Sequence, residues 1–313
     1  MQLPERAAPI GVLVMAYGGP DTIDDVEPYL LDVRGFRPTA AHILNDVRSR
    51  YAAIGGRSPI LERTRAQATA IERALASDGD DAWRVVLGMR HWNPRIKEAL
   101  GELERDGITR AVGVVMAPHY SRMSVGAYER NVANASSPVE TRTIQSWHLL
   151  PGYVQALAER VQLALARFPE AERDDVEVLF TAHSLPQKIL EWNDPYPDQL
   201  AATVRAVMEL LGDRPHRFAF QSAAMTTEPW LGPDASVALG TIAGEGGRNV
   251  VITPIGFTCE HVEILYDVDI EFQRRAAELG LRLERVPMLD DAPVAMAGIA
   301  DMVRESAHAA GWR

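Results

Sequence analysis

The stretch Val12-Leu13-Val14-Met15-Ala16-Tyr17-Gly18-Gly19-Pro20 decides the fold of this chain, and residues 178–186, VLFTAHSLP, repeat its pattern. Each stretch begins with a run of mostly apolar residues and ends in a turn that closes on proline. A short apolar run bounded by turn residues is typical of a buried strand in a parallel sheet. The repetition therefore predicts two similar halves, each opening with such a strand.

Working outward from these stretches, short β-branched runs alternate with segments whose apolar residues recur every three or four positions, as in amphipathic helices. The predicted strands are residues 11–16, 83–87, 111–116, 176–182, 217–220 and 249–253, and the predicted helices include residues 59–76, 94–106, 153–167, 197–211 and 261–279. Strand–helix alternation predicts an α/β fold with parallel sheets. We expect two doubly wound halves, residues 1–120 and 121–313, around a cleft, and the last helix packing back on the first half.

Composition and charge narrow the class of protein. The 313 residues are 47% hydrophobic and 24% charged, which is typical of a globular protein and not of a disordered one. The net charge of −11 opposes nucleic-acid binding, because phosphate neutralisation requires excess basic residues. Cys259 is the single cysteine, so the chain alone forms neither a disulfide nor a Cys-ligated iron–sulfur cluster. No apolar run reaches the length of a membrane span, and we expect a cytoplasmic protein.

His183 directly follows a predicted strand, at the edge where open α/β sheets gather ligand groups. A histidine at this position can act on a ligand, because its charge changes near neutral pH. It can equally cap the strand through a hydrogen bond to the backbone. The sequence leaves both interpretations open.

Three acidic residues recur at helical spacing after residue 260. Glu263, Asp267 and Glu271 are four residues apart, so on a regular helix they form one acidic stripe. Such a stripe is either a solvated face or a path that guides a cation inward. We expect Glu263 at the mouth of the sheet, with Asp267 and Glu271 trailing toward solvent. On the same helix the side chains of His261 and Glu263 would diverge by about 200°, so we expect His261 to pack against or orient a neighbour.

A third group combines basic and hydroxyl side chains in loops that contain glycine. A guanidinium fork suits carboxylate recognition, whereas isolated surface arginines serve only solubility. Both interpretations stay open for this group, which comprises Arg34, Arg37, Arg50, Tyr51, Ser58 and Tyr128.

Taken together, these residues resemble the ferrochelatase family over nearly the whole chain. The matching blocks are VLVMAYGGPDTIDDVEPYL, RYAAIGGRSPI, GMRHWNPRIKEAL, APHYSRMSVGAY, TAHSLPQKI, DPYPDQL, FQSAAMTTEPWLGPD and PIGFTCEHVEILYDVDIE. The resemblance implies two Rossmann-like, chelatase-type halves that insert Fe²⁺ into a porphyrin during haem synthesis. It implies Fe²⁺ as a substrate, no tightly bound cofactor and a monomer.

The resemblance also implies roles for particular residues. His183 matches the histidine of the HSLP block, and Glu263 matches the acidic residue of the His-x-Glu block. Insertion must remove two pyrrole protons, so a neutral imidazole and a carboxylate are expected to face the ring. His183 is then the proton acceptor or transient metal ligand, and Glu263 passes protons or metal. Asp267 and Glu271 form the outer part of the metal path.

Tyr17 bears on which porphyrin is used. The MAYG sequence resembles the bacterial branch that uses coproporphyrin III, in which this tyrosine ligates the metal from the face opposite the histidine. The four propionates of coproporphyrin would be held by Tyr17 and the third group named above. The alternatives are a protoporphyrin IX ferrochelatase, a cobalt or nickel chelatase of a related tetrapyrrole, and a porphyrin or haem carrier without turnover.

Overall fold

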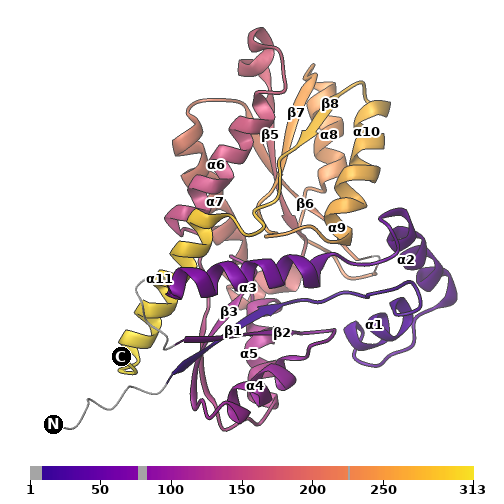
Figure 1. Cartoon of the computed structure of the whole chain (residues 1–313). Coiled ribbons are helices and arrows are strands. Elements are labelled where there is room, and N and C mark those ends of the chain that lie inside the picture. Colours follow the sequence, from indigo (N-terminus) through magenta and orange to yellow (C-terminus); the bar gives the residue numbers. More distant parts are fainter. Residues whose placement is uncertain (1–8, 77–82, 225) are drawn as a thin grey trace.

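A computed structural model describes residues 9–76, 83–224 and 226–313, and within them two α/β units stack on one another (Figure 1). The first parallel sheet has the strand order β2-β1-β3-β4 and the second has the order β6-β5-β7-β8, so one topology occurs twice. The fold class predicted from the sequence is confirmed. The strands are β1 Ile10–Ala16, β2 Trp83–Met89, β3 Arg110–Val115, β4 Glu140–Ile144, β5 Glu177–His183, β6 His216–Gln221, β7 Asn249–Pro254 and β8 Arg282–Arg285.

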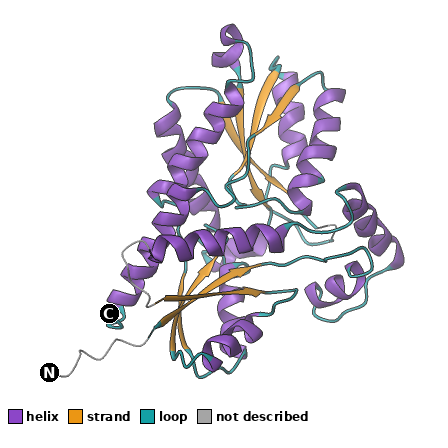
Figure 2. Cartoon of the chain, viewed as in Figure 1, coloured by secondary structure: helices purple, strands orange, loops and turns teal. Residues whose placement is uncertain are grey.

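Helices cover both faces of each sheet (Figure 2). In the first half they are α1 Val26–Val33, α2 Ala41–Ala53, α3 Ile60–Ala76, α4 Ile96–Arg105 and α5 Val125–Asn134. The later segments are α6 Pro151–Leu165, η1 Glu170–Asp175, η2 Gln187–Trp192, α7 Tyr196–Leu211, α8 Ala235–Gly244, α9 Val262–Leu265, η3 Asp267–Phe272, α10 Gln273–Glu278 and α11 Pro293–Ala309. The last helix, α11, packs against α3 of the first half and against α6.

The six predicted strands lie within two residues of their observed bounds, but the sequence missed β4 and β8. Both are edge strands, and their sequences ETRTI and RLER are mostly polar because such strands are only partly covered. The location of β4 corrects the predicted boundary at residue 120. This strand pairs with β3 in the first sheet, so the first half continues through residue 144.

Successive side chains of the central strands point to opposite faces of the sheet and pack into two different parts of the core. Leu13 packs toward α4 and α5, whereas Val12 belongs to a cluster that continues into the second half through Val178 and Phe180. The same cluster includes residues of α3, α6, α7 and α11. Because the two sheets share this core, their relative positions are fixed by apolar packing.

The topology brings particular chain segments together at the carboxyl ends of the strands. In the observed strand order, the chain leaves in opposite directions from β1 and β3, and likewise from β5 and β7, which creates a crevice in each sheet. Tyr17 follows β1, His183 ends β5, and residues 255–263 follow β7. The residues that the sequence singled out therefore lie where open α/β sheets bind ligands.

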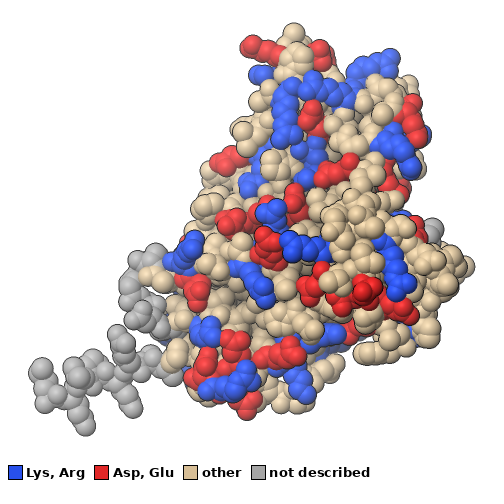
Figure 3. Space-filling view, turned by 45° about the vertical axis from the view of Figure 1, so that its right-hand side comes forward, with Lys and Arg blue, Asp and Glu red and all other residues tan. Residues whose placement is uncertain are grey.

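Two features of the outer surface bear on possible partners: its charge distribution and the apolar character of its helices. On the face that Figure 3 draws, basic and acidic side chains alternate over the described residues instead of forming one basic surface. Within residues 9–76, 83–224 and 226–313, no helix has both the length and the apolar character needed to cross a membrane.

Candidate active site

An ion pair at the end of β5 is the centre of the candidate site. The imidazole Nε2 of His183 lies 3.4 Å from Oε1 of Glu263, and each side chain is about one-third exposed. The other ring nitrogen, Nδ1, donates to the backbone carbonyl of Ser184. One nitrogen therefore caps the strand, and the other faces a carboxylate; that His183 acts on a ligand stays a prediction.

The pair is charged at neutral pH. Burial lowers the pKa of His183, but the Glu263 carboxylate, with a smaller contribution from the Ser184 carbonyl, raises it to about 9. Burial raises the pKa of Glu263, and the His183 charge more than offsets this and holds it below its usual value. The substrate-free site therefore contains an imidazolium and a carboxylate. The neutral imidazole expected from the sequence concerns the insertion step, and for that step it stays a prediction.

The segment after β7 departs from the single regular helix that was predicted over residues 261–279. His261 has an extended backbone, and its Nδ1 accepts the backbone N–H of Glu263 at 3.2 Å. Its ring contacts that of Phe257, with 4.7 Å between the ring centroids. His261 therefore orients Glu263, as expected, but it does so by capping a short helix instead of lying on it.

Asp267 shows a second departure. Tyr266 accepts backbone hydrogen bonds from both Ile270 and Glu271, which makes residues 267–272 a π-helical turn between α9 and α10. Asp267 is only 6% exposed, so the expectation that it trails toward solvent is wrong. The wider turn and the cover that α2 provides place this carboxylate inside the protein.

Contacts on Asp267 explain its proton affinity. It accepts a hydrogen bond from the Ser222 hydroxyl and lies 3.3 Å from Nη1 of Arg50. Burial raises the pKa of Asp267 to about 7, the Glu263 and Glu271 charges add to this, and Ser222 and Arg50 oppose it. The side chain is therefore near half-protonation at neutral pH. Glu271 lies one turn further along and is partly exposed.

Tyr17 follows β1, on the other sheet, and is 38% exposed. Its ring contacts that of His91 at 4.6 Å, and the Arg90 guanidinium lies 5.7 Å above its centroid. Burial of most of the ring raises the pKa of Tyr17 to about 12; Arg90 opposes this and the Glu263 charge adds to it. The phenol is thus neutral and lies within electrostatic reach of Glu263.

Arg90 is a candidate that the sequence reasoning missed. Its guanidinium is held over the rings of Tyr17 and Tyr128, at 5.7 and 5.5 Å. The nearby carboxylate of Asp32 pairs instead with His91 and Arg95, and the described residues provide no ion pair for Arg90. A half-buried, unpaired cation is suited to an anionic ligand. Its position directly after β2, beside the end of β1, is the signal that could have identified it.

The remaining predicted side chains have varied surroundings. Arg34 and Arg37 are exposed after α1, and Arg37 Nε donates to the Arg34 carbonyl at 3.0 Å. Arg50 joins the site but is already paired with Asp46 and Asp267. Three hydroxyl side chains are buried, and they serve packing in this structure: Tyr51, Ser58 and Tyr128. The structure thus brings Arg50 and Tyr128 to the site and leaves Arg34 and Arg37 at the surface.

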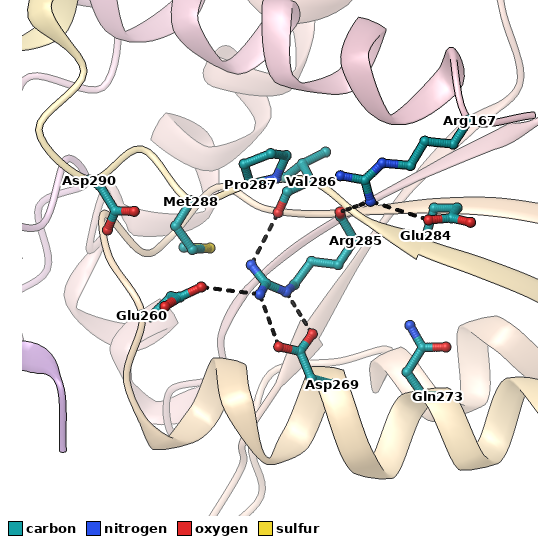
Figure 4. Close-up of a pocket in the computed structure, with 10 residues that line it drawn as sticks. All are labelled: Arg167, Glu260, Asp269, Gln273, Glu284, Arg285, Val286, Pro287, Met288 and Asp290. Atoms are coloured by element: carbon teal, nitrogen blue, oxygen red, sulfur yellow. Dashed lines mark hydrogen bonds and ion pairs between the residues drawn. The ribbon is translucent and has the colours of Figure 1, made fainter. Parts of the chain in front are cut away.

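Two hollows flank this region. One of about 360 Å³ is lined in part by Asp32, Arg90 and His91, which puts it next to Tyr17. The other, of about 400 Å³, surrounds Arg285, and Figure 4 shows that guanidinium held between Asp269 and Glu260. None of the predicted site residues lines either hollow. The cation at the centre of the second hollow, Arg285, is already paired, whereas Arg90 and His91 of the first hollow contact the ring of Tyr17.

The site has few ligands for a metal ion of its own. Among the described residues, no group of three or more His, Cys, Asp or Glu side chains is arranged to hold a metal. Cys259 is buried, and burial raises the pKa of its thiol to about 12, so it does not supply a thiolate. His183 and Glu263 could contribute one or two ligands.

Comparisons with known proteins agree with this geometry. A sequence model of the ferrochelatase family matches residues 9–307. The chain is 42% identical to a ferrochelatase of Herpetosiphon aurantiacus, over 92% of this chain and 95% of the relative. It is 37% identical to a coproporphyrin III ferrochelatase of Listeria monocytogenes, over 91% of this chain and 94% of the relative. The solved structure of the sirohydrochlorin chelatase SirB from Bacillus subtilis subspecies spizizenii has a similar fold, with a TM-score of 0.54, 11% identity and 96% coverage of both chains.

Proposed function

This chain belongs to the ferrochelatase family, and we propose that it inserts Fe²⁺ into coproporphyrin III to give iron coproporphyrin in haem biosynthesis. The observation that carries this proposal is the arrangement of the His183–Glu263 pair on one sheet and Tyr17 with the unpaired Arg90 on the other. Proton-handling groups and an anion-binding group thus belong to opposite halves. A flat, polyanionic macrocycle between them would meet both.

The shortage of protein ligands supports a chelatase. A porphyrin supplies four nitrogen ligands, so a protein that delivers iron to it needs only to hold the metal briefly. His183 and Glu263 suffice for this task, and a permanent site with three or more protein ligands would retain the metal. A carrier without turnover, by contrast, would have no use for an imidazole–carboxylate pair able to exchange protons.

Proton transfer follows from the charges in the site. Insertion releases two pyrrole protons, whereas the resting pair already holds one proton on His183. An arriving Fe²⁺ repels that proton, which leaves through Asp267 to solvent, and the freed Nε2 can contact the metal before it accepts one pyrrole proton. Glu263 accepts the other pyrrole proton. Asp267, with a pKa of about 7, is matched to relay protons outward past Glu271.

The preference for coproporphyrin III rests on cations and on Tyr17. Coproporphyrin carries four propionates and protoporphyrin two, so the former makes better use of Arg90, which has no carboxylate partner among the described residues. Tyr17 is neutral in the resting site, and it would ligate iron from the face opposite His183 once the bound metal lowers the pKa of its phenol and the proton passes to solvent. Relatives named coproporphyrin III ferrochelatase, at 37–38% identity, support this choice.

The experiment is anaerobic incubation of the protein with Fe²⁺ and either coproporphyrin III or protoporphyrin IX, followed by loss of the free-porphyrin absorption bands. We expect rapid turnover of coproporphyrin III and at least about tenfold lower kcat/KM for protoporphyrin IX, because two charge-assisted contacts are lost. The reverse preference would make this a protoporphyrin enzyme. Tight porphyrin binding without turnover by Fe²⁺, but with turnover by Co²⁺ or Ni²⁺, would assign another metal.

A further inference from the structure

Gln221 is a fully buried polar side chain beside the candidate site, and the reactions described above do not use it. It is the last residue of β6, and in the parallel register it is the partner of His183 on β5. Its amide therefore lies at the strand end that carries His183. A buried amide is retained at a cost unless its hydrogen bonds are satisfied.

Each polar atom of this amide has a defined partner. The Oε1 atom accepts from the Thr181 hydroxyl at 2.7 Å, and Nε2 donates to the backbone carbonyl of Glu263 at 3.0 Å. Because the backbone carbonyl of Glu263 can only accept a hydrogen bond, the orientation of the amide is fixed, with Nε2 facing Glu263 and Oε1 facing the Thr181 hydroxyl. The backbone of Glu263 is thus held at both ends, since His261 binds its N–H.

We propose that Gln221 is a positioning residue for metal insertion, whose amide fixes Glu263 relative to His183 so that the carboxylate and the imidazole reach the same reacting atoms. The inference rests on the role proposed for Glu263. One strand pair, β5 with β6, then sets both members of the ion pair: β5 carries His183 itself, and β6 holds Glu263 through the Gln221 side chain. A shift of the carboxylate by about 1 Å is enough to cost roughly 100-fold in rate.

The chain offers a matched control in Gln67 of α3. This glutamine is also fully buried, and its Nε2 donates to two backbone carbonyls, those of Thr258 and Asp290. Gln67→Met and Gln221→Met remove the same amide at equal burial, but only the second removes a contact with Glu263. Both variants are expected to unfold at lower temperature than the parent protein.

We expect Gln221→Met to lower kcat for Fe²⁺ insertion into coproporphyrin III by roughly 10- to 100-fold, with KM for the porphyrin changed less than about threefold. Gln67→Met should leave both constants within about threefold of the parent values. The proposal is overturned if the two variants have equal kcat, or if Gln221→Met changes KM alone.

Gln221→Glu is the second variant if Gln221→Met does not fold. It has the same size and keeps an acceptor for Thr181, but it can donate to the Glu263 carbonyl only when its carboxyl group is protonated. Its kcat relative to the parent should recover as pH is lowered. A ratio that is independent of pH contradicts the proposal.

Amide hydrogen exchange separates this inference from the proposed function, because it needs no turnover. In peptides covering residues 261–266, exchange should be faster in Gln221→Met than in Gln67→Met and the parent protein. Equal exchange in all three overturns the positioning role. If exchange responds but Glu263→Gln retains full activity, the positioning of Glu263 stands and its proposed role in insertion fails.

Discussion

Tyr17 and His183 occupy equivalent positions in the two halves, yet their surroundings differ in charge. Each directly follows an alanine, Tyr17 after the end of β1 and His183 at the end of β5. The strand beside β1 is β2, and the strand beside β5 is β6. Beside the phenol of Tyr17 lies the Arg90 cation, whereas the imidazole of His183 faces the Glu263 anion. The phenol stays neutral and the imidazole is protonated.

This difference shows how a repeated backbone acquires two charge environments. The topology supplies two strand ends that look alike, and the residue placed beside each end decides which charge it holds. On the side of His183 the charges are paired and half-buried, which suits proton and metal transfer. On the side of Tyr17 a cation stays unpaired, which suits a carboxylate of the substrate.

The largest expected effect tests the paired side. His183→Ala and Glu263→Gln should each lower kcat for iron insertion by roughly 10³- to 10⁴-fold, because each removes a proton-transfer group. Porphyrin affinity, measured by quenching of porphyrin fluorescence, should change less than about threefold, since neither residue is expected to hold propionates. Glu278→Gln, an exposed change on α10, is the control. Retained turnover in either site variant would remove that residue from the mechanism.

Asp267→Asn tests the charge on the same side through stability. The pKa of Asp267 is about 7 in the folded protein and 3.8 without its surroundings, so its contribution to stability is full below pH 4 and is lost as pH rises through 7. The Asn side chain does not titrate, so in the Asn variant this position adds no pH dependence to the stability. Between pH 4 and 8 the free energy of unfolding of the parent protein should therefore fall by on the order of 1–4 kcal/mol more than that of the variant, as measured by urea unfolding.

The exposed carboxylate of Asp301 provides the control for that titration. Asp301→Asn should follow the parent protein closely over the same pH range, because a surface ion pair contributes little. A parallel pH dependence of Asp267→Asn and the parent would show that Asp267 ionises normally, and it would remove this residue from the proton path.

Arg90→Met tests the side of Tyr17. Loss of one charge-assisted contact should raise KM for coproporphyrin III about tenfold and leave kcat nearly unchanged. Arg37→Met is the matched comparison, and its effect on KM should be less than about threefold, because an exposed arginine is hydrated and mobile. If Arg37→Met has the larger effect, the loop after α1 holds the substrate and the assignment of Arg90 is wrong.

The smallest effect is expected for Tyr17→Phe, which keeps the ring between Arg90 and His91 and removes only the hydroxyl. The rate of insertion should change about two- to threefold, in line with a group that ligates the product and not the reacting protons. The absorption spectrum of the bound iron porphyrin should change, because an axial ligand is lost. An unchanged spectrum would exclude Tyr17 as a ligand.

Much of the fold followed from local patterns. The six strands that carry apolar runs and the repetition of VLVMAYGGP by VLFTAHSLP were readable because buried parallel strands need continuous apolar sequence. The edge strands β4 and β8 were not readable, since a half-covered strand has no such run. The boundary at residue 120 was wrong for the same reason, because β4 was missing from the first half.

The site divides in a similar way. Residue type and position after a strand identified His183, Glu263 and Tyr17 as candidates. The sequence could not predict that the Asp267 side chain is buried. Its burial depends on a π-helical turn and on packing against α2, which lies more than 200 residues earlier in the chain. The sequence also could not identify Arg90 as a candidate, because its guanidinium is held by the rings of Tyr17 and Tyr128, which lie on other segments of the chain.

The sequence by itself determined the α/β class, the repeated halves, the family and the chemical types of the central side chains, because these depend on periodicity and on motifs contained in short segments. Only the tertiary structure decided which of these groups are charged and which remain unpaired. Protonation of His183, the raised pKa of Asp267 and the hydrogen bond from Gln221 to Glu263 all arise from burial and from partners on distant strands. Such effects depend on distance through space, which spacing along a chain does not specify.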